Sequence, residues 1–90
     1  MYFESRGRTI LIHTPKMKYR FLSKLDIIEN YMLDNEIHFL RIHQSYLINP
    51  YHIRSITISN IKMIDHSILS IGPKYQAQVR LQYLHIVEDL

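Results

Sequence analysis

One stretch decides the fold: FLRIHQSYLIN, residues 39–49, which is followed directly by Pro50. In its first half, apolar and polar side chains alternate with the period of two that is typical of a β-strand. If residues 39–43 are extended, Leu40 and Ile42 lie on one face of the strand and their neighbours lie on the other. The stretch therefore predicts a β-strand with one buried face and one polar face.

The second face of this strand carries Phe39, Arg41 and His43, and Gln44 and Ser45 follow where the strand ends. The polar groups suit phosphate oxygens and base edges, because arginine and glutamine can each make paired hydrogen bonds and serine can bond a phosphate. A solvated face is also ordinary for a strand in an antiparallel sheet. The pattern alone leaves two interpretations open, a solvated strand face and a surface that recognises nucleic acid.

Length and composition indicate one folded domain over residues 1–90, with 47% hydrophobic residues. A chain of this length buries about two thirds of the surface that its unfolded form exposes, so it holds one modest core and hardly a deep catalytic cleft as well. It has no cysteine, which excludes disulfides and thiolate zinc sites. It also has neither the apolar run of a membrane span nor the pattern of a signal peptide. We expect a cytoplasmic protein that has no membrane partner.

Charge is unevenly distributed along the chain, which carries 11 Lys and Arg against 8 Asp and Glu, a net charge of +3. Up to residue 24, Glu4 is the only acid. The cations of this segment are Arg6, Arg8, Lys16, Lys18, Arg20 and Lys24. Such segregation indicates one face of positive potential, as in proteins that bind a polyanion.

The N-terminal part predicts a hairpin of residues 2–5 and 9–14 around Gly7, because glycine supplies the positive φ of a tight turn. A third strand is expected over residues 17–21, after Pro15. Its alternation separates apolar from cationic side chains: Met17, Tyr19 and Phe21 on one face, Lys18 and Arg20 on the other.

A helix is expected to start at Ser23, whose hydroxyl can cap an early amide, with an acid three residues later at the positive helix end. The helix continues to about Leu33 and is closed by Asp34 and Asn35. The predicted core face consists of Leu25, Ile28 and Met32, widened by Ile27 and Tyr31.

The second half predicts a hairpin of residues 53–59 and 61–64, a turn at 65–67, and a strand at 68–71 that pairs back. A helix from about Lys74 follows. Tyr75, Val79 and Tyr83 are spaced by four residues, as expected for one helix face.

The six histidines form no recognisable metal motif, since they stand apart and no third ligand accompanies any pair. Ser45 lies near His43, but nothing marks an oxyanion hole or a strained strand-to-helix turn. We therefore expect no catalytic residue, no metal ligand and no cofactor, and the chain is not expected to be an enzyme.

The signature Phe39-x-Arg41-x-His43-x-Ser45-Tyr46-x-Ile48-Asn49 resembles that of the LytTR DNA-binding domain of bacterial response regulators. Every position is met except a valine, replaced by Ile48. The resemblance covers nearly the whole chain, with residues 2–5, 53–56 and 69–75 matching further segments of the family. Departures occur at residues 72–75, where the family often carries Ser and Arg before the Tyr, and at residues 25–36, which look longer than usual.

The resemblance implies a mostly β fold with two short helices, an elongated antiparallel assembly in which loops enter the major groove of duplex DNA. It implies base contacts by Arg8 at the hairpin tip, by Gln44, which suits adenine, and by Lys74, where the family's arginine is missing. The expected contacts to the DNA backbone are Arg6, Lys24, His43 and Ser45.

Two residues of the signature are expected to be structural. Arg41 would pair with an acid such as Glu4, and Asn49 would cap a turn before Pro50.

The resemblance also implies transcriptional control in a bacterial two-component phosphorelay. Residues 1–90 would be the C-terminal output domain of a longer response regulator, whose receiver domain promotes pairing of two copies. Half-sites about one helical turn apart would place both copies on one side of the DNA, which we expect to be bent.

Two other functions are compatible with the residues. A small interaction module could add a strand to a partner's sheet at an exposed edge such as residues 61–64. Single-stranded RNA binding ranks last, because the aromatic residues fall at core-like spacings and leave no stacking platform. The aromatic residues in question are Tyr19, Phe21, Tyr75 and Tyr83.

Overall fold

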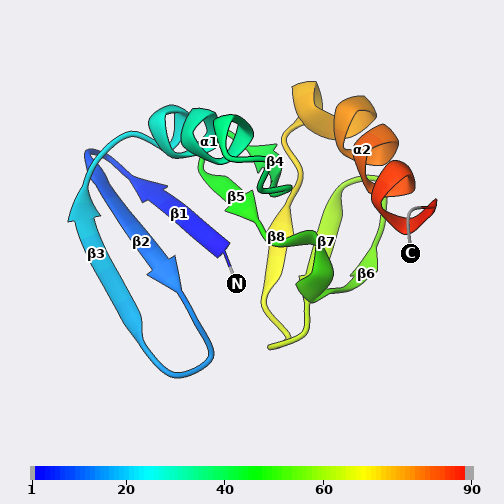
Figure 1. The fold of residues 1–90 in the computed structure, drawn as a ribbon. Helices are drawn as coiled ribbons and strands as arrows, with labels where there is room; N and C mark the ends of the chain where they lie inside the picture. The colour runs from blue at the N-terminus through cyan, green and yellow to red at the C-terminus, as the bar shows by residue number, and fades with distance from the viewer. Residues whose placement is uncertain (1, 89–90) are drawn as a thin grey trace.

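The computed structural model describes residues 2–88, which form two antiparallel β-sheets and two α-helices (Figure 1). The first sheet contains β1 (Tyr2–Arg6), β2 (Thr9–His13), β3 (Lys18–Leu22), β4 (Leu40–His43) and β5 (Tyr46–Ile48). The second contains β6 (Ile53–Ile56), β7 (Asn60–Met63) and β8 (Ile68–Ser70). The helices are α1 (Leu25–Asp34) and α2 (Gln76–Glu88), with short 3-10 turns η1 (Pro50–His52) and η2 (Pro73–Tyr75). Strand order is β3-β2-β1-β5-β4 in the five-stranded sheet and β6-β7-β8 in the three-stranded sheet.

This architecture confirms the predicted fold class, which is mostly β with two helices and small antiparallel sheets. The principal extents are 34, 29 and 25 Å, so the molecule is less elongated than the resemblance implied. The opening hairpin turns at Gly7, where φ is +60°, so the expected use of glycine is also confirmed. Asn49 accepts a hydrogen bond from the amide of Tyr51 at 3.0 Å, which is the predicted capping role.

The signature stretch forms two strands where the sequence analysis predicted one. The chain reverses at Gln44 and Ser45, and β5 then pairs with β4 and with β1. The second strand is only three residues long and almost entirely apolar, so it has no alternation from which it could be predicted. Strand β5 lies between β1 and β4, so this part of the signature is paired on both sides within the five-stranded sheet.

The core has two parts, one on each face of that sheet. On one face, Leu40 and Ile42 pack with Ile61 and Met63 of β7 and with Val79 of α2. On the other face a smaller cluster lies beneath α1, formed by Ile10, Leu25 and Leu47 with flanking partly buried residues. The predicted division is confirmed for Phe39, Leu40, Arg41 and Ile42. It is wrong for His43, because a bulge between Arg41 and His43 pairs His43 with Tyr46 and places its ring on the face of the larger cluster.

Strand β3 differs from expectation, because both of its faces are exposed. Tyr19 is 51% exposed and Phe21 is 40% exposed, so their predicted core role is wrong. The reason is that α1 packs on β1 and β5 and leaves the outer strand uncovered. Tyr75 and Tyr83, in contrast, pack against the larger core cluster as predicted.

The start of α1 also differs from the prediction. Lys24 occupies the N-cap position and no side chain caps the helix, so the expected cap by Ser23 is wrong. Ile27 and Tyr31 lie in solvent, so the core face of the helix is narrower than predicted. Ile28 and Met32 pack on the smaller cluster as expected.

The edge proposed for strand addition does not exist. Residues 61–64 include most of β7, which is the central strand of its sheet and is paired on both sides. Ile61 and Met63 are fully buried there. The interaction-module interpretation therefore loses the surface on which it was based.

We expect the larger core cluster to carry much of the stability. Replacing the fully buried Ile42 by alanine should lower the free energy of unfolding by about 2–5 kcal/mol, through lost apolar transfer and an incompletely filled cavity. Ile68→Ala, on a strand residue that is 67% exposed, is the matched control and should cost less than about 0.5 kcal/mol. Urea unfolding monitored by circular dichroism measures both, and equal losses would contradict the assignment of the core.

Candidate nucleic-acid interface

Three turns and a helix start meet at one end of the five-stranded sheet. The amide of Ser5 donates to the carbonyl oxygen of Ser45 at 2.8 Å, which joins the β1 end to the β4–β5 turn. The amide of Ser23 donates to the carbonyl oxygen of Arg8 at 3.1 Å, which joins the start of α1 to the β1–β2 turn. These segments lie along the upper side of the molecule in Figure 1.

The turn before α2 reaches the same region. The amide of Gly72 donates to the carbonyl oxygen of Ile42 at 2.8 Å. A Cβ atom at Gly72 would lie 3.1 Å from Cδ2 of Tyr75 and 3.5 Å from Cδ2 of His43, so the absence of a side chain lets these two rings approach the turn. Lys74 is thereby held close to the signature, with its Nζ 5.1 Å from the centre of the Tyr75 ring.

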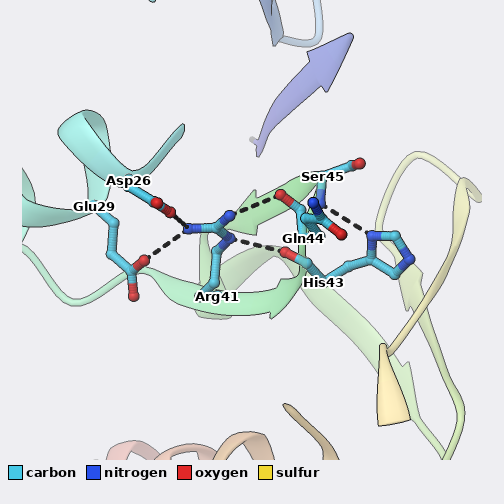
Figure 2. Close-up of polar contacts among 6 residues, drawn as sticks. All are labelled: Asp26, Glu29, Arg41, His43, Gln44 and Ser45. Carbon is cyan, nitrogen blue, oxygen red and sulfur yellow. Dashed lines mark hydrogen bonds and ion pairs between the residues drawn. The ribbon is translucent and has the colours of Figure 1, made fainter. Parts of the chain in front are cut away.

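The guanidinium of Arg41 is the central polar group of this region (Figure 2). Its Nη1 donates to Oδ1 of Asp26 at 2.7 Å and to Oε1 of Glu29 at 2.8 Å, both on α1. Nε donates to the carbonyl oxygen of His43 at 2.8 Å, and Nη2 donates to that of Gln44 at 2.7 Å. One buried cation thus joins α1, β4 and the β4–β5 turn.

Arg41 is only 7% exposed, so its guanidinium is used inside the protein and is not free for phosphate. Burial would lower the pKa of Arg41, but the bonds to Asp26 and Glu29 outweigh it and the pKa is raised. The expected acid partner was wrong: Glu4 instead bonds Nε of Arg6 at 2.9 Å and Nε2 of His13 at 2.7 Å.

The role of Asp26 and Glu29 as partners of Arg41 was missed in the sequence analysis. Asp26 and Glu29 are three residues apart, which places them on one side of a helix beside the core face. That spacing was the available signal for a shared cationic partner. Which cation they bind depends on how α1 docks on the sheet, and one helix pattern does not contain that information.

His43 and Ser45 form a pair within the β4–β5 turn. The amide of Ser45 donates to Nδ1 of His43 at 3.0 Å, so in the neutral ring the proton lies on Nε2. The His43 ring also tilts against Tyr46, with 5.4 Å between ring centres. Nε2 is therefore oriented as a hydrogen-bond donor by contacts on two sides.

The remaining predicted contact residues lie in solvent. Arg8, Lys24, Gln44 and Lys74 are all exposed. Within residues 2–88 no carboxylate pairs with any of these three cations. Arg6 is also exposed, but its Nε is occupied by Glu4. The end of the sheet therefore presents cations and one amide on turns whose backbones are tied together.

Among residues 2–88, no three histidine or acidic side chains are placed so that they could hold a metal ion. In the same part of the chain no helix is long and apolar enough to cross a membrane.

These features define a class of protein, a small β-domain that carries exposed cationic side chains on turns at one end of its sheet. The family model of the LytTr DNA-binding domain matches residues 1–83. The chain therefore belongs to the LytTR family of DNA-binding domains, which act in transcription regulation and are not an enzyme family.

One solved structure with a similar fold is the LytTr DNA-binding domain of a Bacillus cereus protein described as a methyl-accepting/DNA response regulator. Identity is 23% and the TM-score is 0.77, with 91% of this chain and 78% of that chain covered. The likeness confirms the fold expected from the signature. None of the curated proteins compared with the chain matches it.

We expect Arg41 to be essential for the geometry of the β4–β5 turn. Arg41→Ala should lower the free energy of unfolding by about 2–3 kcal/mol, because the buried acceptors of the guanidinium lose their donor. The loss is limited because the carboxylate of Asp26 is exposed and stays hydrated. Arg41→Lys should not restore it, because an ammonium cannot reproduce the planar fork. Arg8→Ala removes an exposed cation and should change stability by less than about 0.5 kcal/mol. Urea unfolding tests this, and full rescue by lysine would contradict it.

Acid should weaken the fold through Asp26 and Glu4. The bond from Arg41 lowers the pKa of Asp26 below its ordinary value of 3.8. Burial would raise the pKa of Glu4, but the bonds from Arg6 and His13 lower it below its ordinary 4.5. A carboxyl with a lowered folded-state pKa stabilises above its unfolded pKa, and this stabilisation is lost as pH falls through the folded value.

The free energy of unfolding should therefore fall as pH decreases below about 4.5. Asp26→Asn should make this decrease shallower, and Asp34→Asn, at the far end of α1, should not. Urea titrations at a series of pH values measure the slopes, and identical slopes for the three proteins would refute the role of Asp26.

Proposed function

We propose that the domain recognises a specific sequence of duplex DNA by inserting its turns into the major groove. The observation that carries this proposal is the buried Arg41, which ties the carbonyl oxygens of Gln44 and His43 in place while the Gln44 side chain remains in solvent. A turn with a fixed backbone presents its amide group in a defined direction. Direct readout of base edges needs such a direction, because paired hydrogen bonds are sensitive to geometry.

In this proposal the contacts divide into two kinds. Gln44 makes paired hydrogen bonds to a base, adenine by preference, and Arg8 and Lys74 contact bases from the two neighbouring turns. The backbone of the DNA is held by a second group that carries little sequence information. Its members are Arg6, Lys24, His43 through Nε2, and Ser45.

The domain would act as the output domain of a bacterial two-component response regulator. A receiver domain elsewhere in the protein would be phosphorylated, two copies would occupy half-sites about one helical turn apart, and the DNA would be bent between them. Such a regulator works in the cytoplasm. Family membership and the cationic sheet end support this proposal.

The test is selection of bound duplexes from a randomised DNA pool by the 90-residue chain at moderate salt. Enrichment of a short motif, repeated about one helical turn apart, is the expected result. Affinity should also fall steeply with salt as counterions are released. No enrichment, together with salt-independent binding to bulk duplex, would reject the proposal.

Gln44→Ala should relax specificity at one base position of the selected motif. Losing a paired contact with a base costs about 1–3 kcal/mol of discrimination there, and the other positions should keep theirs. Gln82→Ala, an exposed glutamine of α2, is the matched control and should leave the whole profile unchanged. Competition binding with single-base variants of the motif measures both proteins, and a uniform loss at all positions for Gln44→Ala would contradict base readout.

A further inference from the structure

Strand β3 is an edge strand that carries cations and lies outside the recognition turns. It is the outer strand of the five-stranded sheet, and all five of its residues are exposed. Lys18 and Arg20 alternate with Tyr19 and Phe21 along it. An edge strand that no other element covers is free to meet a partner.

Register determines which face carries the cations. Phe21 lies opposite Ile10, which is buried beneath α1, so the aromatic side chains share the face on which α1 packs. Lys18 lies opposite His13, and Arg20 lies opposite Leu11, which places both cations on the other face. The two cations therefore extend from the same side of the sheet.

This cationic face continues from the candidate interface. Ser23, directly after β3, is bonded to Arg8 at the β1–β2 turn. With a rise of about 3.3 Å per residue, Arg20 lies about 10 Å and Lys18 about 17 Å along the strand from that point. The two cations are about 6.6 Å apart, whereas one strand of B-DNA carries a phosphate every 3.4 Å along its axis. They can thus meet different phosphates beyond the bases contacted by the turns.

Nearby charge favours an anionic partner for this face. Glu4 is the only acid before residue 26, and its carboxylate is occupied by Arg6 and His13. Within residues 2–88 no carboxylate pairs with Lys18 or Arg20. Neither cation of β3 is therefore held in an ion pair within the described part of the chain.

A second copy of the chain fits this edge poorly. In an antiparallel pairing centred on Tyr19, Lys18 of one copy would face Arg20 of the other, and a pairing centred on Arg20 would bring two guanidinium groups together. Like charges in directly opposed positions destabilise a pair of strands. Lysine on an edge is a known obstacle to such pairing.

We propose that Lys18 and Arg20 bind the phosphate backbone of duplex DNA that flanks the recognised bases. The inference rests on the proposed function and extends its footprint along β3, away from the turns. Flanking contacts of this kind add affinity and salt dependence, and they do not change which sequence is preferred.

The experiment compares two duplexes, one trimmed to the selected motif and one carrying about ten further base pairs of random sequence on each side. The proteins are the 90-residue chain, Lys18→Gln/Arg20→Gln, and the control Arg54→Gln/Lys62→Gln. The control removes the same charge from β6 and β7 of the other sheet. Equal unfolding midpoints establish that all three proteins are folded.

The β3 variant should bind the flanked duplex about tenfold more weakly near physiological salt, and its salt slope should fall by about 1.8, which is two phosphate contacts. Its affinity for the trimmed duplex and its preferred sequence should match those of the unchanged chain. The control should retain the gain in affinity that flanks provide.

Three results would overturn the inference: equal losses on both duplexes, an equal loss for the control, or an unchanged salt slope. A β3 variant that forms dimers while binding DNA normally would show that the cations only prevent edge pairing, and would also overturn it. If the unchanged chain binds no duplex in a salt-sensitive way, the proposed function itself fails, and this result is distinct from all of the others.

Discussion

The buried guanidinium of Arg41 is the interaction on which the candidate interface depends. A cation removed from water is costly unless its donors find strong acceptors. Its acceptors come from Asp26 and Glu29 on α1 and from two carbonyl oxygens of the β4–β5 turn. Those groups are far apart in the chain, so the cation is satisfied only when helix, strand and turn are all in place. The turn that carries Gln44 is consequently held by the same cation that docks α1 on the sheet.

The core supplies the platform for this network, because apolar residues of β4 and β5 pack on both faces of the sheet. Leu40 and Ile42 face β7 and α2, while Leu47 faces α1. A strand buried on both faces has little freedom to slip, since a shift of one residue would exchange its two apolar surfaces. Register at the sheet centre thus positions Ser45 against Ser5, and the turns arrive together at one end.

At that end of the sheet, the acidic side chains within residues 2–88 are all in ion pairs with basic ones. Glu4, Asp26 and Glu29 lie near it, and each is engaged with a basic side chain of the same region. Arg8 and Lys74 have no such partner among the described residues. Asp26 and Glu29 thus share the one charge of Arg41, and the cations without an ion-pair partner lie on turns and on an uncovered edge strand.

Period and turn chemistry made much of the fold predictable from the sequence alone. Alternation around Leu40 and Ile42 indicated the buried strand, Gly7 indicated the hairpin, and the signature indicated the family, because all of these are local patterns. The partner of Arg41, the exposure of β3, the second strand of the signature and the central place of β7 were decided only in the tertiary structure. Each depends on which elements pack together, and that is set by the long-range fit of apolar surfaces and buried charges, which no local pattern records.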